Sequence, residues 1–180
     1  MIPVKIQKIS YHHPNRSYAV ILKEIEGERK LPVLVGAFEA QAIAMAMEFM
    51  ETPRPLTHDL IVNLINGIDG SLSSVKIIKL EDGVFYSILD LESKKYGSYN
   101  IDARPSDAIA ISLRENAPIL ISETLIKNTS FQKNGYSKLK NNFNNKNLLS
   151  KLKIRLKNAV KNEKYEIAAE IRDKIKKIES

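Results

Sequence analysis

The segment IDARPSDAIAISLRENAPI, residues 101–119, decides the fold of this chain. It opens with residues typical of a strand, and Pro105 then marks a helix start because its fixed φ suits the first helical position. Ala108 and Ile109 begin the apolar face of that helix. After Pro118, the run PILIS predicts a last short strand. The segment therefore predicts a strand, a helix and a second strand in immediate succession.

The residues before this segment predict a set of antiparallel strands. SSVKIIKL, VFYSILDL and SYNIDA follow one another between residues 73 and 103, and the turn at 81–83 contains a glycine. Short β-rich runs separated by polar turns are typical of a meander. We therefore expect neighbouring strands here to pair with each other.

The N-terminal third predicts strands followed by two helices. PVKIQKISY, SYAVILKEI and KLPVLVG indicate two or three strands within residues 3–36. From about Ala37 the apolar spacing becomes helical, and this helix should end before Pro53. A second helix is expected over 57–68, where leucines and isoleucines form an apolar stripe.

This order of elements favours an α+β fold. Strands, two helices, strands, one helix and one strand lack the regular alternation of a doubly wound sheet. We therefore predict an antiparallel or mixed sheet with about three helices packed on it, followed by a separate C-terminal helical hairpin.

Composition indicates a globular protein and excludes thiol chemistry. The chain has 180 residues, of which 43% are hydrophobic, and this content suffices for a packed core. Without cysteine, the chain cannot form disulfides, thiolate metal sites or a cysteine nucleophile. No apolar run is long enough to span a membrane, and the first residues alternate instead of forming a leader. We therefore expect a cytoplasmic protein without a membrane partner.

Charge divides the chain into a nearly neutral body and a basic tail. Residues 1–127 carry 14 Lys+Arg and 16 Asp+Glu, net −2, whereas residues 128–180 carry 14 and 5, net +9. The Asn- and Lys-rich segment 128–147 lacks apolar periodicity and is predicted to be a linker. The basic tail would attract a polyanion such as RNA or DNA, or its lysines simply solvate exposed helix faces.

Residues 148–180 predict a helical hairpin. Leu152 and Leu156 mark one apolar helical face, and Ala168, Ile171 and Ile175 mark a second. Because a hairpin of this length buries little surface, its apolar seam is expected to meet a partner or another copy.

Four segments resemble the bifunctional nuclease (BFN) domain family. They are LPVLVGAFEAQAIAMAM, RPLTHDL, DGVFYSILDL and IDARPSDAIAISLRENAPI, in the order in which the family has them, and they span about residues 31–121. Members of this family are described as cleaving both RNA and DNA. The resemblance therefore implies a nuclease with little sequence preference in residues 1–127, and it also implies a homo-oligomer.

The tail is similar to the UVR motif of nucleotide-excision-repair subunits and of some protease adaptors. In those relatives the motif is a helical hairpin used for protein contacts. The resemblance implies that the hairpin docks a protein, through the residues Tyr165, Ala168, Ala169, Ile171, Arg172 and Ile175.

Phosphodiester hydrolysis suggests candidate site residues within the matching segments. It needs a positioned nucleophile and neutralised phosphoryl oxygens, which carboxylate-held Mg²⁺ or Mn²⁺ can supply. We predict catalytic roles for Glu39, His58, Asp59, Asp102 and Asp107, substrate contacts for Arg54, Arg104 and Ser106, and metal binding by Asp59, Asp102 and Asp107.

Two interpretations of these residues remain open. Glu39, Asp59 and Asp107 each fall near a predicted helix start, where an acid is stabilised by the helix dipole. The arginines could equally pair with these acids as structural links. Arg54-Pro55 and Arg104-Pro105 both precede a helix start, however, and convergence of the two starts would gather a site. The alternative function is a non-catalytic oligomeric adaptor that recruits a repair or proteolysis partner through the hairpin.

Overall fold

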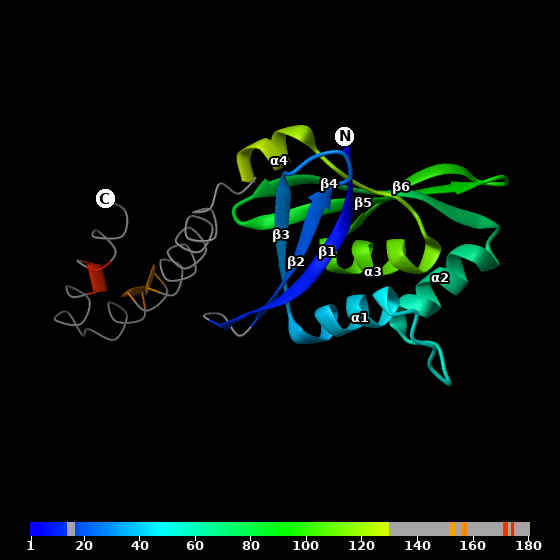
Figure 1. The fold of residues 1–180 in the computed structure, drawn as a ribbon, viewed down its shortest axis with the longest axis horizontal. Helices are drawn as coiled ribbons and strands as arrows, with labels where there is room; N and C mark the ends of the chain where they lie inside the picture. The colour runs from blue at the N-terminus through cyan, green and yellow to red at the C-terminus, as the bar shows by residue number, and fades with distance from the viewer. Residues whose placement is uncertain (14–16, 130–151, 154–155, 158–170, 173, 175–180) are drawn as a thin grey trace. The chain divides into compact units, whose positions relative to one another are not determined.

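The computed structural model describes residues 1–13, 17–129, 152–153, 156–157, 171–172 and 174 (Figure 1). It separates into two units, Met1–Phe131 and Gln132–Ser180. The predicted division into 1–127, 128–147 and 148–180 stays a prediction, and the linker lies outside the described residues except for 128 and 129.

The first unit is an α+β structure, as the order of elements predicted. Its elements are β1 (Ile2–His12), β2 (Ser17–Glu24), β3 (Lys30–Val35), α1 (Ala37–Met47), α2 (Thr57–Gly67), β4 (Gly70–Glu81), β5 (Val84–Ser93), β6 (Gly97–Ala103), α3 (Pro105–Glu115), β7 (Ile119–Ile121) and α4 (Glu123–Thr129). The predicted strands and the three long helices are confirmed, and α4 is an additional short helix.

One mixed sheet of seven strands organises this unit. The strand order is β3-β2-β1-β7-β4-β5-β6, and the neighbours are antiparallel except for β4 and β7, which run parallel. The β4-β5-β6 meander is confirmed. β7 enters between β1 and β4 and thereby joins the N-terminal strands to the meander.

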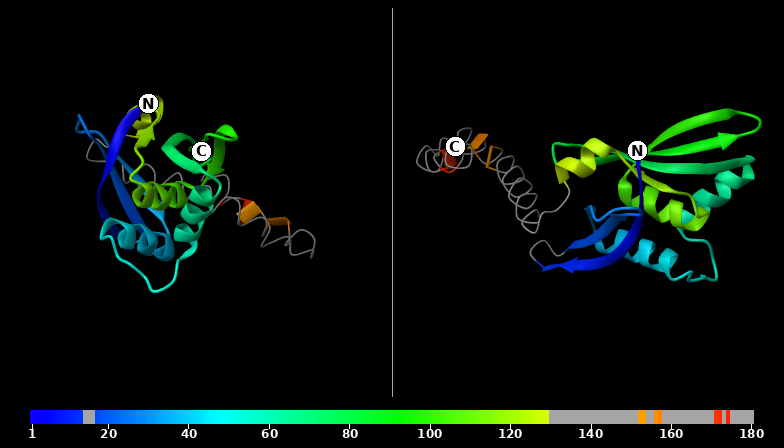
Figure 2. Two further views of the ribbon diagram at one scale, coloured as in Figure 1. Left: turned by 90° about the vertical axis from the view of Figure 1, so that its right-hand side faces the viewer. Right: turned by 45° about the horizontal axis from the view of Figure 1, so that its top comes forward.

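The central helix α3 packs against α1 on one side and α2 on the other (Figures 1 and 2). Its residues Ile109 and Ala110 join a core made with β1–β3 and α1, whereas Ala108 and Ile111 join a second core with β4, β5 and α2. This double burial fixes the start of α3 between the starts of the other two helices.

The apolar stripe of α2 is only partly buried. Ile65 is buried and Ile61 is half-buried, but Leu60, Leu64 and Ile68 are exposed. No helix in the described part of the chain is long and apolar enough to cross a membrane.

Few residues of the second unit are described, and these are helical at Leu152, Leu156 and Ile171. The side chains of Leu152 and Ile171 are buried and pack with Leu156. This contact joins one residue of the second predicted face to two residues of the first, as expected for a hairpin.

Candidate active site

A cavity of about 1170 Å³ opens where the starts of α1, α2 and α3 meet strands β5 and β6. Most of its wall is apolar, with Phe38, Leu56 and Ile101 among the lining residues. Its polar side chains include Glu39, His58, Asp102, Arg104 and Asp107. Five of the eight residues predicted to form the site thus line one cavity.

Each helix places an acid in its first turn, namely Glu39 in α1, Asp59 in α2 and Asp107 in α3. This position is favourable for an acid because the backbone N–H groups at a helix N-terminus carry partial positive charge. The predicted positions of the three acids near helix starts are confirmed, and the starts of α2 and α3 do converge, which is the condition for the site hypothesis. The start of α1 joins them.

Gly36 gives Glu39 room to fold back over the start of α1. A Cβ at position 36 would collide with Oε2 of Glu39. The absence of a side chain at Gly36 therefore lets the Glu39 carboxylate stay close to the helix N-terminus, beside the cavity.

Arg104 connects two of these acids. It is the N-cap residue of α3, directly before Pro105. Its Nε and Nη2 donate to the two Asp107 carboxylate oxygens at 2.7 and 3.0 Å, and its Nη1 donates to Glu39 Oε1 at 3.3 Å. The arginine side chain is nevertheless 66% exposed. Its guanidinium is thus oriented by both acids while it still faces solvent.

His58 of α2 contacts the same Asp107 carboxylate that Arg104 binds. Its Nε2 lies 3.3 Å from Asp107 Oδ1, and the histidine side chain is only 15% exposed. An ionised carboxylate can only accept a hydrogen bond, so Nε2 carries a proton, and in the neutral imidazole Nδ1 then has the lone pair. Asp107 therefore fixes both the ring and the tautomer of His58.

Ionisation of Asp107 is favoured at neutral pH. Burial alone would raise the pKa of Asp107, but hydrogen bonds from Arg104 and His58 and the positive charge of Arg104 outweigh it and hold the pKa below its usual value. The carboxylate is therefore charged when it faces His58.

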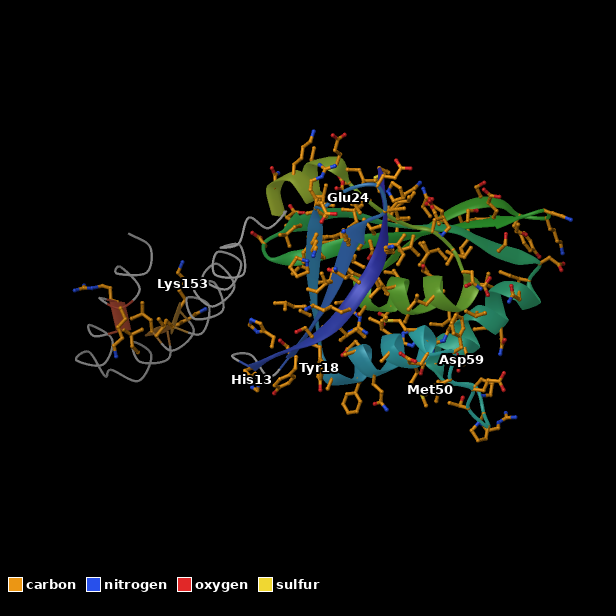
Figure 3. All side chains as sticks on the ribbon, viewed as in Figure 1. His13, Tyr18, Glu24, Met50, Asp59 and Lys153 are labelled. Carbon is orange, nitrogen blue, oxygen red and sulfur yellow. The ribbon has the colours of Figure 1, made fainter. Side chains whose placement is uncertain are left out.

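Asp59 has the contacts of the structural alternative, and it is not among the residues that line the cavity. Its Oδ1 accepts a 2.5 Å hydrogen bond from Nε of Arg114, and its Oδ2 accepts the backbone N–H of Leu56 at 2.8 Å. The second bond caps α2. Arg114 also donates to the carbonyl oxygens of Ala42 and Ala110, so one arginine joins all three helices. These contacts of Asp59, which Figure 3 labels, are those of a structural residue.

Acid should weaken this structural link. The hydrogen bond from Arg114 lowers the pKa of Asp59, although burial opposes it. A carboxyl with a lowered folded-state pKa stabilises the protein above its unfolded pKa of about 3.9 and loses that contribution as pH falls through the folded value. We expect Asp59→Asn to be less stable than the unsubstituted protein at neutral pH, with a difference that shrinks below about pH 4.

Urea unfolding from pH 7 to pH 2 measures this difference. Asp69→Asn is the matched control because Asp69 is exposed, lies just after α2 and has a positive φ, which asparagine tolerates. A difference between Asp59→Asn and the unsubstituted protein that stays constant over this pH range would contradict the prediction.

Arg54 does not join the site, which corrects the expected parallel with Arg104. Arg104 stands directly before Pro105, the first residue of α3. In α2 the N-cap is Leu56 and the helix begins at Thr57, so Arg54 lies three residues before the helix. Arg54 is exposed and is not among the residues that line the cavity.

Ser106 is buried, and its predicted contact with substrate stays a prediction. It is 7% exposed, belongs to the first turn of α3 and is not among the residues that line the cavity. Asp102, in contrast, is exposed on β6 and lines the cavity, as a site residue should.

The predicted metal ligands are not gathered. Among the described residues no group of three or more His, Asp or Glu side chains could hold a metal ion. Asp59 faces Arg114, and Asp107 faces Arg104 and His58, so cationic or N–H groups already satisfy both carboxylates. This arrangement does not fit a preformed Mg²⁺ or Mn²⁺ site, and the metal requirement stays a prediction.

Two residues of the site had no motif to reveal them. Arg114 is an arginine in the last turn of a helix rich in buried residues. This was the only sequence feature that could have indicated its role. Phe38 lines the cavity although it is 85% exposed, and nothing in the sequence separates it from a core phenylalanine.

The predicted docking residues of the hairpin are only partly described. Tyr165, Ala168, Ala169 and Ile175 lie outside the described residues. Ile171 is buried against Leu152 and Leu156, so its side chain supports the second unit itself. Arg172 is exposed.

Comparisons with known proteins agree with this organisation. The family model for the bifunctional nuclease domain matches residues 20–134, and that for the UvrB/uvrC motif matches residues 146–180. The uncharacterized protein Rv1829 of Mycobacterium tuberculosis (strain ATCC 25618 / H37Rv) is 39% identical over 123 residues, 68% of this chain and 73% of that protein.

A more distant relative carries a functional name. Bifunctional nuclease 1 of Oryza sativa subsp. indica is 24% identical over 118 residues, 64% of this chain and 36% of the rice protein. Because the nuclease-domain match spans more than half of the chain and the mycobacterial relative is similar over most of its length, this chain belongs to the bifunctional nuclease domain family and carries a C-terminal UvrB/uvrC motif.

Proposed function

We propose that this protein cleaves phosphodiester bonds in both RNA and DNA, with little sequence preference, at the cavity between α1, α2 and α3. The observation that carries the proposal is the contact series His58–Asp107–Arg104–Glu39, which opens into that cavity. Family membership supports the nuclease class.

Arg104 is suited to bind the phosphate. Its three bonds to Asp107 and Glu39 use three of the five guanidinium N–H groups, so two remain for phosphoryl oxygens. The planar fork matches phosphate geometry, and the two acids fix its orientation before substrate arrives. Arg104 would thereby offset the charge that develops on the phosphoryl oxygens.

His58 is suited to activate the nucleophile. With the proton of Nε2 directed at Asp107, Nδ1 can take a proton from a water molecule as the water oxygen attacks phosphorus. The bond from phosphorus to the leaving oxygen breaks, and solvent supplies the proton for that oxygen. Asp107 stabilises the imidazolium that forms.

The cavity and the C-terminal tail carry charges of opposite sign. Glu39, Asp102 and Asp107 make the cavity acidic, whereas residues 128–180 carry a net charge of +9. Attraction of the polyanion through the tail is sequence-independent and weakens with salt. The apolar walls of the cavity accept the face of any base, which agrees with little sequence preference.

Cleavage by Asp107→Asn is the first test. We expect at least a 10²-fold loss of cleavage with an unchanged fold. Asparagine has the same volume as aspartate, but it lacks the negative charge that holds the His58 tautomer and stabilises the imidazolium. The assay uses the full chain on single-stranded and duplex RNA and DNA, with Mg²⁺, Mn²⁺ or EDTA. Circular dichroism and thermal unfolding report the fold.

Asp69→Asn, purified identically, is the control because Asp69 lies outside the cavity. Cleavage by the unsubstituted protein that does not exceed the background of Asp107→Asn would contradict the proposal. That outcome would favour the adaptor function. Activity that survives EDTA would separately remove the metal requirement.

We also propose that the C-terminal hairpin docks a protein partner. The UvrB/uvrC motif supports this role, and the burial of Ile171 against Leu152 supports a folded hairpin as the docking unit. The identity of the partner and the predicted cytoplasmic location stay predictions.

A further inference from the structure

An exposed apolar surface joins α2 to β6. Its members are between 46% and 60% exposed, and we call them the α2–β6 surface: Leu60, Leu64, Ile68, Tyr96, Tyr99 and Ile101. Leu60 and Leu64 of α2 and its C-cap residue Ile68 are spaced by four and therefore form one stripe. Ile68, Tyr96, Tyr99 and Ile101 line a second cavity of about 230 Å³, so helix and strand contribute to one continuous surface.

The β6 residues of this surface face the same side of the sheet as α2. In the β5–β6 pairing, Leu91 is opposite Tyr99 and Leu89 is opposite Ile101. Leu89 and Leu91 are buried with Ile65 of α2. Opposite residues of paired strands share a face, so Tyr99 and Ile101 continue this core outward to a sheet edge where nothing in the described chain covers them.

β6 is a terminal strand of the sheet, and half of its backbone N–H and C=O groups therefore point outward. All its residues except Ala103 are exposed, and it contains neither proline nor lysine. The opposite terminal strand, β3, begins with Lys30, contains Pro32 and is mostly buried. Proline and lysine are common devices that prevent pairing at an edge, and β6 lacks them.

We propose that two copies of this chain associate through β6, paired antiparallel about a twofold axis at Asn100. This register places Tyr99 opposite Ile101 of the second copy, and it places Ser98 opposite Asp102 of the second copy. Like charges are thus kept apart, while the apolar side chains meet on the face that carries both α2 stripes. The same surface serves both copies.

The apolar area suits a pair of this kind. Six large side chains at about half exposure offer roughly 600 Å² per copy, or roughly 1,200 Å² in total, the lower limit for a specific interface. Hydrogen bonds between the two β6 edges add to this area. The proposal concerns assembly and holds whether or not the cavity cleaves nucleic acid.

A single introduced cysteine tests the register, because the chain has none. Because position 100 lies on the twofold axis, the cysteine of Asn100→Cys would face the same cysteine of the second copy. The two Cα atoms would be about 4.5–5.5 Å apart, within the range for a disulfide. We expect mild oxidation of the full chain to give a covalent dimer on a non-reducing gel. Ser98→Cys is the matched control. Position 98 would be opposite Asp102 of the second copy, four residues from the second cysteine, so this variant should not cross-link.

Molar mass in solution provides the second measurement. We expect light scattering to give twice 20.4 kDa for the unsubstituted chain and 20.4 kDa for Leu64→Lys at the same concentration. Met50→Lys, at a residue of similar exposure after α1, should keep the doubled mass (Figure 3). A monomeric unsubstituted chain, a trimer, or a dimer that Leu64→Lys leaves intact would overturn the proposal. A dimer in which Asn100→Cys does not cross-link would overturn it equally.

Discussion

Replacing His58 by alanine is expected to lower cleavage of RNA and DNA by about 10²- to 10⁴-fold, the range for loss of a general base. The reason is geometric. His58 is the residue whose Nε2 contacts Asp107 while its ring lines the cavity. Without the imidazole, the attacking water has no positioned proton acceptor, although Arg104 can still bind phosphate.

The measurement separates chemistry from binding. Binding of a short oligonucleotide by fluorescence anisotropy should change little in His58→Ala, because the charged groups of the site and the basic tail remain. Cleavage of the same oligonucleotide should fall. His13→Ala is the matched control, since His13 directly follows β1 and is not among the residues that line the cavity (Figure 3). Equal cleavage by His58→Ala and His13→Ala would rule out His58 as the base.

The elements of the fold could be predicted because their signals are local. Alternation in β1, β4 and β5 and helical spacing in α1 and α3 follow from which face each segment buries. The strand order could not be predicted, since β7 pairs with β1 and β4 across long stretches of chain. The seven-residue helix α4 was missed because it is too short for a periodic signal.

The site could be predicted only in part. An arginine before a proline at a helix start indicated Arg104 and its neighbour Asp107, and the structure brings both to one cavity, where their roles stay predictions. The same pattern failed for Arg54, because Leu56 is the N-cap of α2 and Arg54 lies two residues before it, whereas Arg104 is itself the N-cap of α3. The sequence shows the dipeptide, whereas its function depends on whether the arginine itself caps the helix.

The partner of Asp59 could not be predicted because it is tertiary. Arg114 lies 55 residues along the chain and reaches Asp59 only when α2 and α3 pack side by side. A carboxylate next to His58 therefore looked catalytic in the sequence, although its contacts are those of a structural residue. Residues that position a site are harder to predict than residues that line it, because their partners lie on other elements.

Replacing Arg114 by methionine is expected to lower the free energy of unfolding by about 2–3 kcal/mol, less than for a fully buried pair because Asp59 is partly exposed. The change removes the Asp59 ion pair and the bonds to the Ala42 and Ala110 carbonyls. Thermal unfolding should show a fall in Tm of roughly 6–12 °C. Arg104→Met is the matched control, because the exposed Arg104 should contribute at most about 1 kcal/mol.

The effect on activity should differ in kind between these two arginines. Arg114 does not line the cavity, so Arg114→Met should lower kcat only through the position of α2, which carries His58. Arg114→Lys keeps the charge but loses the fork, and we expect it to recover part of the stability and part of kcat together. Arg104→Met should instead weaken phosphate binding while the protein stays folded. If Arg114→Met kept the Tm of the unsubstituted protein, the contacts of Arg114 with the three helices would not contribute to stability. The hydrophobic core alone would then hold α2 and His58 in position.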